Sequence, residues 1–230
     1  MRKTNIMLAV AALAFAICSC NPESKNPLSD PSTAKHDSRL TGTWVGQVDD
    51  IKSRDVVWLH ISEIKGSMTK FIQINTDKGN DINFYKAFST TIGNETYLNI
   101  KPDVPEEGFL TEEKRAEIET SNYLLAKYAI SKDGILRIWL MTNAISKAIE
   151  NGQIKGIPEK NETQGNTTVH TNAEITDSSE NLVTFLSTTD HQGLFGLALK
   201  LRRVNTPPPA WDGEESKQES LKGKRRPSTP

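Results

Sequence analysis

Histidines are the residues best suited to acid–base or metal chemistry in this sequence, and its 230 residues hold only four: His36, His60, His170 and His191. None belongs to an H-x-x-x-H or H-E-x-x-H spacing, which would bring two imidazoles to one zinc ion. Asp190 precedes His191 and is able to orient its ring, but no serine in a nucleophile motif accompanies the pair. We therefore expect no metal site, no cofactor and no enzyme activity. A hydrolase that uses His191 or His170 is the weakest hypothesis.

The other reactive groups are two thiols that follow an N-terminal apolar run. The residues from Ile6 to Ile17 are uncharged and come after Arg2 and Lys3. A run of this length is too short for a membrane-spanning helix, which needs ~20 apolar residues, and is typical of a secretory signal peptide. The stretch Ile17-Cys18-Ser19-Cys20 resembles the bacterial lipobox, in which a small residue precedes the cysteine that receives lipid.

The lipobox resemblance implies a lipoprotein with a signal peptide at residues 1–19, cleavage between Ser19 and Cys20, and acyl chains such as palmitate on Cys20. Two or three acyl chains anchor a protein stably, so the membrane is a partner through lipid alone. Asn21, rather than Asp, follows the lipidated cysteine, which favours the outer membrane of the bacterial envelope. No cysteine follows Cys20, so no disulfide can form in the rest of the chain, even in the periplasm.

Polar, proline-containing segments flank the central part of the chain. Residues 20–38 hold one large apolar side chain, Leu28, and residues 206–230 hold hardly more, so we expect a disordered tether and a disordered tail. Residues 39–205 are enough for a single domain with its own core. The net charge is −1, and −3 once the two cations of the signal peptide are removed, which argues against nucleic acid as a partner.

The central part alternates apolar and polar residues with the period of β-strands. We expect strands at 40–48, 56–64, 69–75, 82–90, 95–101, 123–131, 135–141 and 194–204, and another around 167–176. Short helices are expected at 112–120, at 143–151 and after the capping box at 177–180. The sequence therefore predicts a mainly β fold, an antiparallel meander barrel with two or three short helices; the alternative is a β-sandwich.

Gly42-Thr43-Trp44 at the head of the first strand resembles the Gly-x-Trp motif of lipocalins. In that family the Trp closes one end of the barrel, and an Arg from a late strand lies across its ring. The resemblance implies structural closure by Gly42, Trp44 and Arg203. The sequence departs from the family in lacking a Thr-Asp-Tyr-like motif near 123–141. Three segments, 97–99, 123–125 and 182–186, also look like those of uncharacterised small β-rich bacterial lipoproteins.

Two further hypotheses concern binding. In the first, the chain is a membrane-anchored, non-enzymatic envelope module, and its barrel binds a small apolar or amphipathic ligand between Trp44, Ile61, Phe84 and Leu199. In the alternative, it is an envelope protein–protein interaction module or structural lipoprotein with a filled core. It would then dock another envelope protein through an outer face, for example the loop 102–122, and expose an apolar patch.

Overall fold

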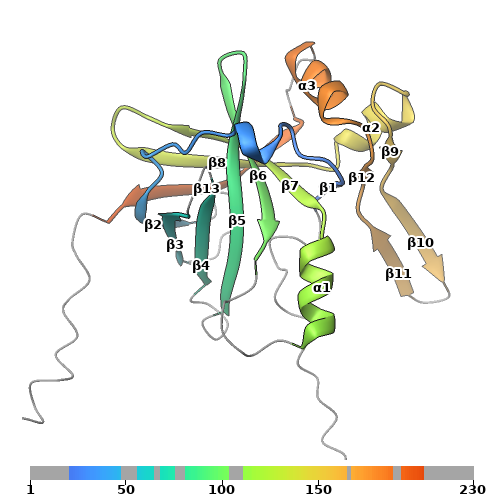
Figure 1. The fold of residues 1–230 in the computed structure, drawn as a ribbon. Helices are drawn as coiled ribbons and strands as arrows, with labels where there is room; N and C mark the ends of the chain where they lie inside the picture. The colour runs from blue at the N-terminus through green and yellow to red at the C-terminus, as the bar shows by residue number, and fades with distance from the viewer. Residues whose placement is uncertain are drawn as a thin grey trace, which may run out of the picture.

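The computed structural model describes residues 21–47, 56–64, 68–75, 81–103, 111–164, 167–188 and 193–204, and its centre is a closed, lipocalin-like antiparallel barrel (Figure 1). Eight of the described strands form it: β2 (Gly42–Gln47), β3 (Val56–Glu63), β4 (Thr69–Asn75), β5 (Asp81–Ile92), β6 (Glu95–Pro102), β7 (Tyr123–Ile130), β8 (Ile135–Met141) and β13 (Phe195–Arg203). Each strand pairs with the next in this order, and β13 returns to β2. The meander barrel is thus confirmed, and the sandwich alternative is wrong.

Strand alternation fills the barrel with apolar side chains. In β3, Val57, Leu59 and Ile61 are buried and point inward, whereas Trp58 and His60 between them are exposed. The same alternation in the other strands makes one buried cluster, which consists of Leu40, Trp44, Val57, Leu59, Ile61, Phe71, Tyr85, Ala87, Leu98, Ala126, Tyr128, Leu136, Ile138, Leu199 and Leu201. An eight-stranded barrel is just wide enough for side chains to fill it.

A second layer covers the outside of the barrel over β5 to β8. It contains the helices α2 (Ile145–Glu150) and α3 (Ser179–Thr188) and the short strands β1 (Glu23–Ser24), β9 (Gly156–Ile157) and β12 (Glu174–Ile175). β1 pairs with β7 and β12, and β12 pairs with β9, so these strands extend the sheet beyond the barrel. The layer buries its own cluster, which includes Leu28, Tyr97, Leu125, Ile145, Ile149, Ile175, Leu182 and Phe185.

The remaining described elements lie at the surface. The helix α1 (Glu112–Thr120) has the predicted bounds, and a separate hairpin is made by β10 (Lys160–Gln164) and β11 (Thr167–Thr171). A single 3-10 turn, Pro31–Thr33, lies near the N-terminal end of the described chain. Among the described residues, no helix has the length and apolar character needed to cross a membrane.

The prediction of a disordered tether is wrong for residues 21–38. This segment lies along the barrel surface: β1 belongs to the sheet, and Leu28 is only 1% exposed. The Leu28 N–H donates to Asn99 Oδ1 at 2.6 Å, and Ser29 Oγ lies 2.6 Å from Thr90 Oγ1. One buried leucine together with hydrogen bonds supplied by the barrel therefore orders a segment whose composition is polar. Residues 1–20 and 206–230 lie outside the described part of the chain.

Candidate functional site

Trp44 and Arg203 meet at one end of the barrel. They face each other across β2 and β13, and the Arg203 Cζ lies 4.7 Å from the Trp44 ring centroid. The indole Nε1–H donates to the Leu40 carbonyl at 2.7 Å, and the Arg203 guanidinium donates to the Arg39 carbonyl. Gly42 has a φ of 135°, and a Cβ there would lie 3.8 Å from Arg203 Nε. The Trp44 ring on one side and the Arg39 carbonyl on the other therefore hold the Arg203 guanidinium in place.

A cleft of about 760 Å³ opens beside this pair, between the β7–β8 hairpin, the start of β2 and the end of β13. Its charged lining residues are Arg39, Arg202, Arg203 and Asp133; Trp44, Ile130 and Ile135 supply the apolar part. The hairpin turns at Gly134, whose φ of 74° is a conformation that glycine adopts without strain. Positive charge predominates in this cleft.

A hydrogen-bonded chain behind the cleft fixes Arg39. The Arg39 guanidinium donates to both carboxylate oxygens of Asp37, at 2.7 Å from Nη2 to Oδ2 and 2.9 Å from Nε to Oδ1. The Tyr128 hydroxyl donates to Asp37 Oδ2 at 2.9 Å. The hydrogen bond from Arg39 lowers the pKa of Asp37, whereas burial raises the pKa of Tyr128 to about 12. At neutral pH the carboxylate is therefore charged and the phenol neutral.

The predicted pocket residues do not all lie together. Trp44, Ile61 and Leu199 belong to the buried cluster inside the barrel, where they pack among other side chains. Phe84 is wrong as an inward-facing residue, because Tyr85 beside it points inward and Phe84 lies on the outer face, with Lys70 Nζ 5.9 Å from its ring centroid. Apolar residues occur at both even and odd positions of β5, so its sequence did not show which face of the strand points inward.

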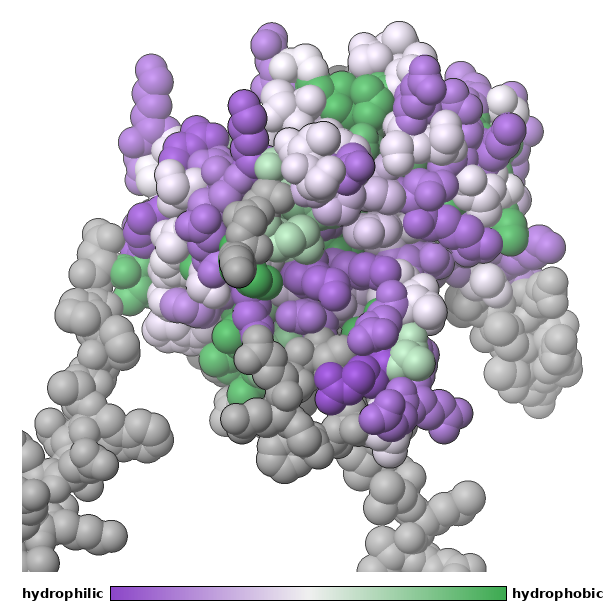
Figure 2. Space-filling model, viewed as in Figure 1, coloured by the Kyte–Doolittle hydropathy of each residue, from purple (hydrophilic) through white to green (hydrophobic). Residues whose placement is uncertain are grey.

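The outer face of β2 to β5 carries an unusual apolar row. Val45, Trp58, Ile74 and Ile82 lie directly opposite one another on the four neighbouring strands. Trp58 is 38% exposed and Ile82 54%. Figure 2 shows hydrophobic side chains at the surface near the lower ends of β3, β4 and β5, bordered by hydrophilic ones. We call these four residues the apolar row.

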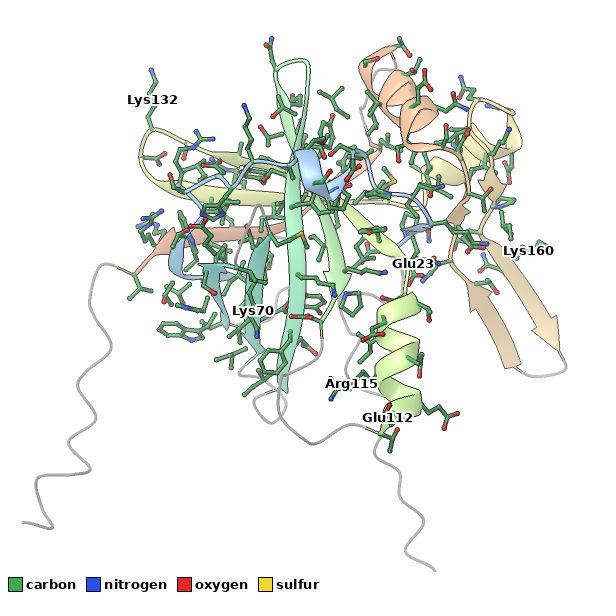
Figure 3. All side chains as sticks on the ribbon, viewed as in Figure 1. Glu23, Lys70, Glu112, Arg115, Lys132 and Lys160 are labelled. Carbon is green, nitrogen blue, oxygen red and sulfur yellow. The ribbon has the colours of Figure 1, made fainter. Side chains whose placement is uncertain are left out.

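Two further rows run parallel to the apolar row. The next row along the strands combines polar and apolar residues: Thr43, His60, Ile72 and Phe84. The row after it is Ser62, Lys70, Lys86 and Lys101, so three lysines from adjacent strands lie side by side. Lys70 is labelled in Figure 3 on this face. The face thus changes from apolar to basic along the strand direction.

The histidines do not converge where the structure describes them. His60 Nδ1 lies 3.0 Å from Thr43 Oγ1 on the outer face of the barrel. His36 lies between Thr69 and Thr41, with nitrogen-to-oxygen distances of 3.1 and 2.9 Å. His170 belongs to β11, but its side chain, like all of His191, is outside the described part. Within the described residues, no three side chains form a group able to hold a metal ion.

Comparison with protein-family models, with curated proteins and with solved structures finds no match to this chain. We therefore assign the fold from the pairing of the strands, and we infer function from the surfaces described above.

Sequence reasoning selected Arg203 and Trp44 but missed Arg39, Arg202 and Asp133 of the same cleft. A usable signal was present, because the first and last strands of a closed barrel are neighbours. Charges just before the first strand, at Asp37 and Arg39, must then lie near those that end the last strand. The outer apolar row was also missed, since Val45, Trp58, Ile74 and Ile82 come from four separate strands.

Proposed function

We propose that this chain is a membrane-anchored bacterial envelope lipoprotein whose barrel docks another envelope protein through the outer face of β2 to β5. The observation that carries the proposal is the apolar row of Val45, Trp58, Ile74 and Ile82. Trp58 and Ile82 of this row are exposed, and Val45 and Ile74 are half-buried; an apolar patch with a polar border is typical of interaction surfaces. A barrel interior packed with apolar side chains favours this alternative over a ligand held between Ile61 and Leu199.

The pattern of charges on this face indicates the chemistry of the partner. The apolar row would contact apolar side chains, and Lys70 and Lys86 would face carboxylates, whereas Lys101 Nζ already donates to the Glu119 carbonyl at 2.8 Å. Lys86 already lies 3.8 Å from Asp103, so part of this charge is balanced within the chain. Because strand pairing fixes both rows across β2 to β6, their complement is a folded protein surface with apolar and acidic residues. We therefore infer a protein partner rather than a lipid surface.

The short distance between Cys20 and the sheet supports a partner close to the membrane. Only Asn21 and Pro22 lie between Cys20 and β1, which begins at Glu23. A chain spans at most ~3.6 Å per residue, so the lipid would lie within about 11 Å of the sheet. The barrel would then be held at the membrane surface, and its partner would be a membrane-bound or membrane-proximal protein.

Cys20→Ala tests the anchor. We expect this variant to leave the membrane fraction and to lose labelling by a fatty-acid probe, because no other cysteine follows position 20. Ser19→Ala is the matched control, since it keeps a small residue before the cysteine and should stay anchored. Membrane association of Cys20→Ala without any label would contradict the lipoprotein assignment.

Site-specific photo-crosslinking in cells tests the docking face. A photoreactive residue at Ile82 should crosslink the full chain to one defined protein, and the same residue at Ile157 should not. The two isoleucines are matched, being 54% and 46% exposed, and Ile157 lies on β9, outside the barrel. Ile82→Asp should then weaken binding of the purified partner at least tenfold, whereas Ile157→Asp should not. Crosslinks to a second copy of the chain, to lipid alone, or equally from both positions would refute the proposal.

A further inference from the structure

We propose that the cleft beside Trp44 and Arg203, at one end of the barrel, is a binding site for a phosphate group. Its charged lining is three arginines, Arg39, Arg202 and Arg203, against one carboxylate, Asp133. Guanidinium groups bind phosphate through paired N–H donors in a fixed plane, so an arginine cluster in a cleft is suited to this anion. The inference does not rest on the docking proposal, because different residues carry it.

The surroundings of the cleft add to its positive charge. Lys200 and Arg202 both belong to β13. Lys200 lies directly opposite Arg137 of β8 on the outer face. Lys132 lies at the tip of the β7–β8 hairpin, where Figure 3 labels it. Asp37, the second carboxylate at this end, balances the charge of Arg39, so the excess positive charge comes from Arg202 and Arg203 against Asp133, together with these neighbours. A cleft that concentrates charge of one sign raises the local concentration of ligands of the opposite sign.

Two of the three guanidinium groups are held in position before any ligand binds. Arg203 stacks on Trp44 and donates to the Arg39 carbonyl, and Arg39 is fixed by Asp37. A guanidinium has five N–H donors, so donors remain after these contacts. Arg202 is exposed and forms no ion pair with the described carboxylates, although the charge of Asp133 is near enough to interact with it. Binding would therefore order one side chain rather than three, which reduces its entropic cost.

The apolar part of the lining allows two sources of the phosphate group. Ile130 and Ile135 lie beside the arginines and would contact an alkyl chain, as in a lipid headgroup with its glycerol and acyl carbons. A free phosphate ester would use the arginines alone. The carboxylate of Asp133 would repel either anion. Its removal in Asp133→Asn should therefore strengthen binding, whereas the removal of an arginine should weaken it.

Isothermal titration of the full chain, as processed by the cell and kept in a neutral detergent, with inorganic phosphate and with hexyl phosphate tests the site. We expect hexyl phosphate to bind, Arg202→Gln to weaken it about tenfold, and Asp133→Asn to strengthen it about threefold. Lys160→Gln is the matched control, since it removes the same charge at the exposed Lys160 of β10, on the opposite side of the molecule in Figure 3. Its affinity should equal that of the unmodified chain.

The two probes separate the sources. Tighter binding of hexyl phosphate than of inorganic phosphate identifies a lipid headgroup, and equal binding identifies a free phosphate; both support the site. The proposal is overturned if neither probe binds, or if Arg202→Gln and Lys160→Gln weaken binding equally. Asp133→Asn keeps the test decisive should Arg202→Gln fold poorly, because an unchanged affinity in Asp133→Asn also overturns it.

Discussion

The contact between Arg203 and Trp44 joins the two strands that close the barrel. Arg203 is itself exposed, but its guanidinium covers an indole that is only 1% exposed and donates to the Arg39 carbonyl, so its removal uncovers the ring and takes away this donor. Arg203→Ala should therefore lower the free energy of unfolding by about 1–2 kcal/mol. Urea unfolding followed by circular dichroism measures this. Arg202→Ala is the neighbouring control and should stay within about 0.5 kcal/mol; equal losses in both variants would refute the prediction.

Asp37 makes stability depend on pH. Its pKa is lowered in the folded chain, mainly by the hydrogen bond from Arg39, so it stabilises the fold above the unfolded pKa of ~3.9, and this stability is lost as the pH falls through its folded pKa. Asp37→Asn should therefore cost about 1–2 kcal/mol at pH 7. The difference from the unmodified chain should shrink as the pH falls below about 4. Urea midpoints at pH 7 and pH 3 measure it, and a constant difference would contradict the role of this charge.

At the scale of elements, the segment from Glu23 to Thr33 acts as a strap over the barrel. Leu28 is its single large buried side chain, and it packs in the outer cluster beneath α2 and α3. Leu28→Ala should lower the free energy of unfolding by about 2–4 kcal/mol, because it leaves a cavity at a fully buried site. Ile157→Ala, at an exposed site, should cost below about 1 kcal/mol. If Leu28→Ala lowered the free energy of unfolding by less than about 1 kcal/mol, this segment would contribute little to the fold, as expected of a tether.

Strand periodicity predicted most of the barrel elements. β4 and β8 have the predicted bounds because glycine or polar turns mark their ends, although neither sequence, TKFIQIN or ILRIWLM, alternates clearly. β1 and β10 were not predicted, since a strand of two residues and the wholly polar Lys160–Gln164 show no alternation. Both exist through pairing with partners, β7 and β12 for β1, and β11 for β10. Hydrophobic periodicity detects strands that bury one face. β1 and β10 lack this periodicity, so it could not detect them.

At the scale of the whole molecule, strand pairing creates both candidate surfaces: the meander β2 to β5 forms the apolar row, and closure of the barrel by β13 and β2 forms the cleft. The cleft joins residues near 39, 133 and 203, and the apolar row joins residues from 45 to 82. Neither set is adjacent in sequence, so only the order and register of the strands bring each together. The strand pattern of the sequence predicted the meander order, but not the register. A shift of one residue in β5 would exchange Phe84 and Tyr85 between the outside and the inside.

The packing inside the barrel decides between the two binding hypotheses. Ile61 is fully buried in the interior cluster, so Ile61→Ala should lower the free energy of unfolding by about 2–5 kcal/mol if that interior is filled. Were Ile61 instead to line a ligand cavity, little packing would be lost and the cost would stay below about 1 kcal/mol. Native mass spectrometry supplies the independent measurement, since a chain with a filled barrel, purified from cells, should show no additional mass from a bound small molecule. An extracted small molecule, together with a small cost for Ile61→Ala, would favour the internal ligand; a clean mass with a large cost leaves the outer surfaces as the places where this protein binds.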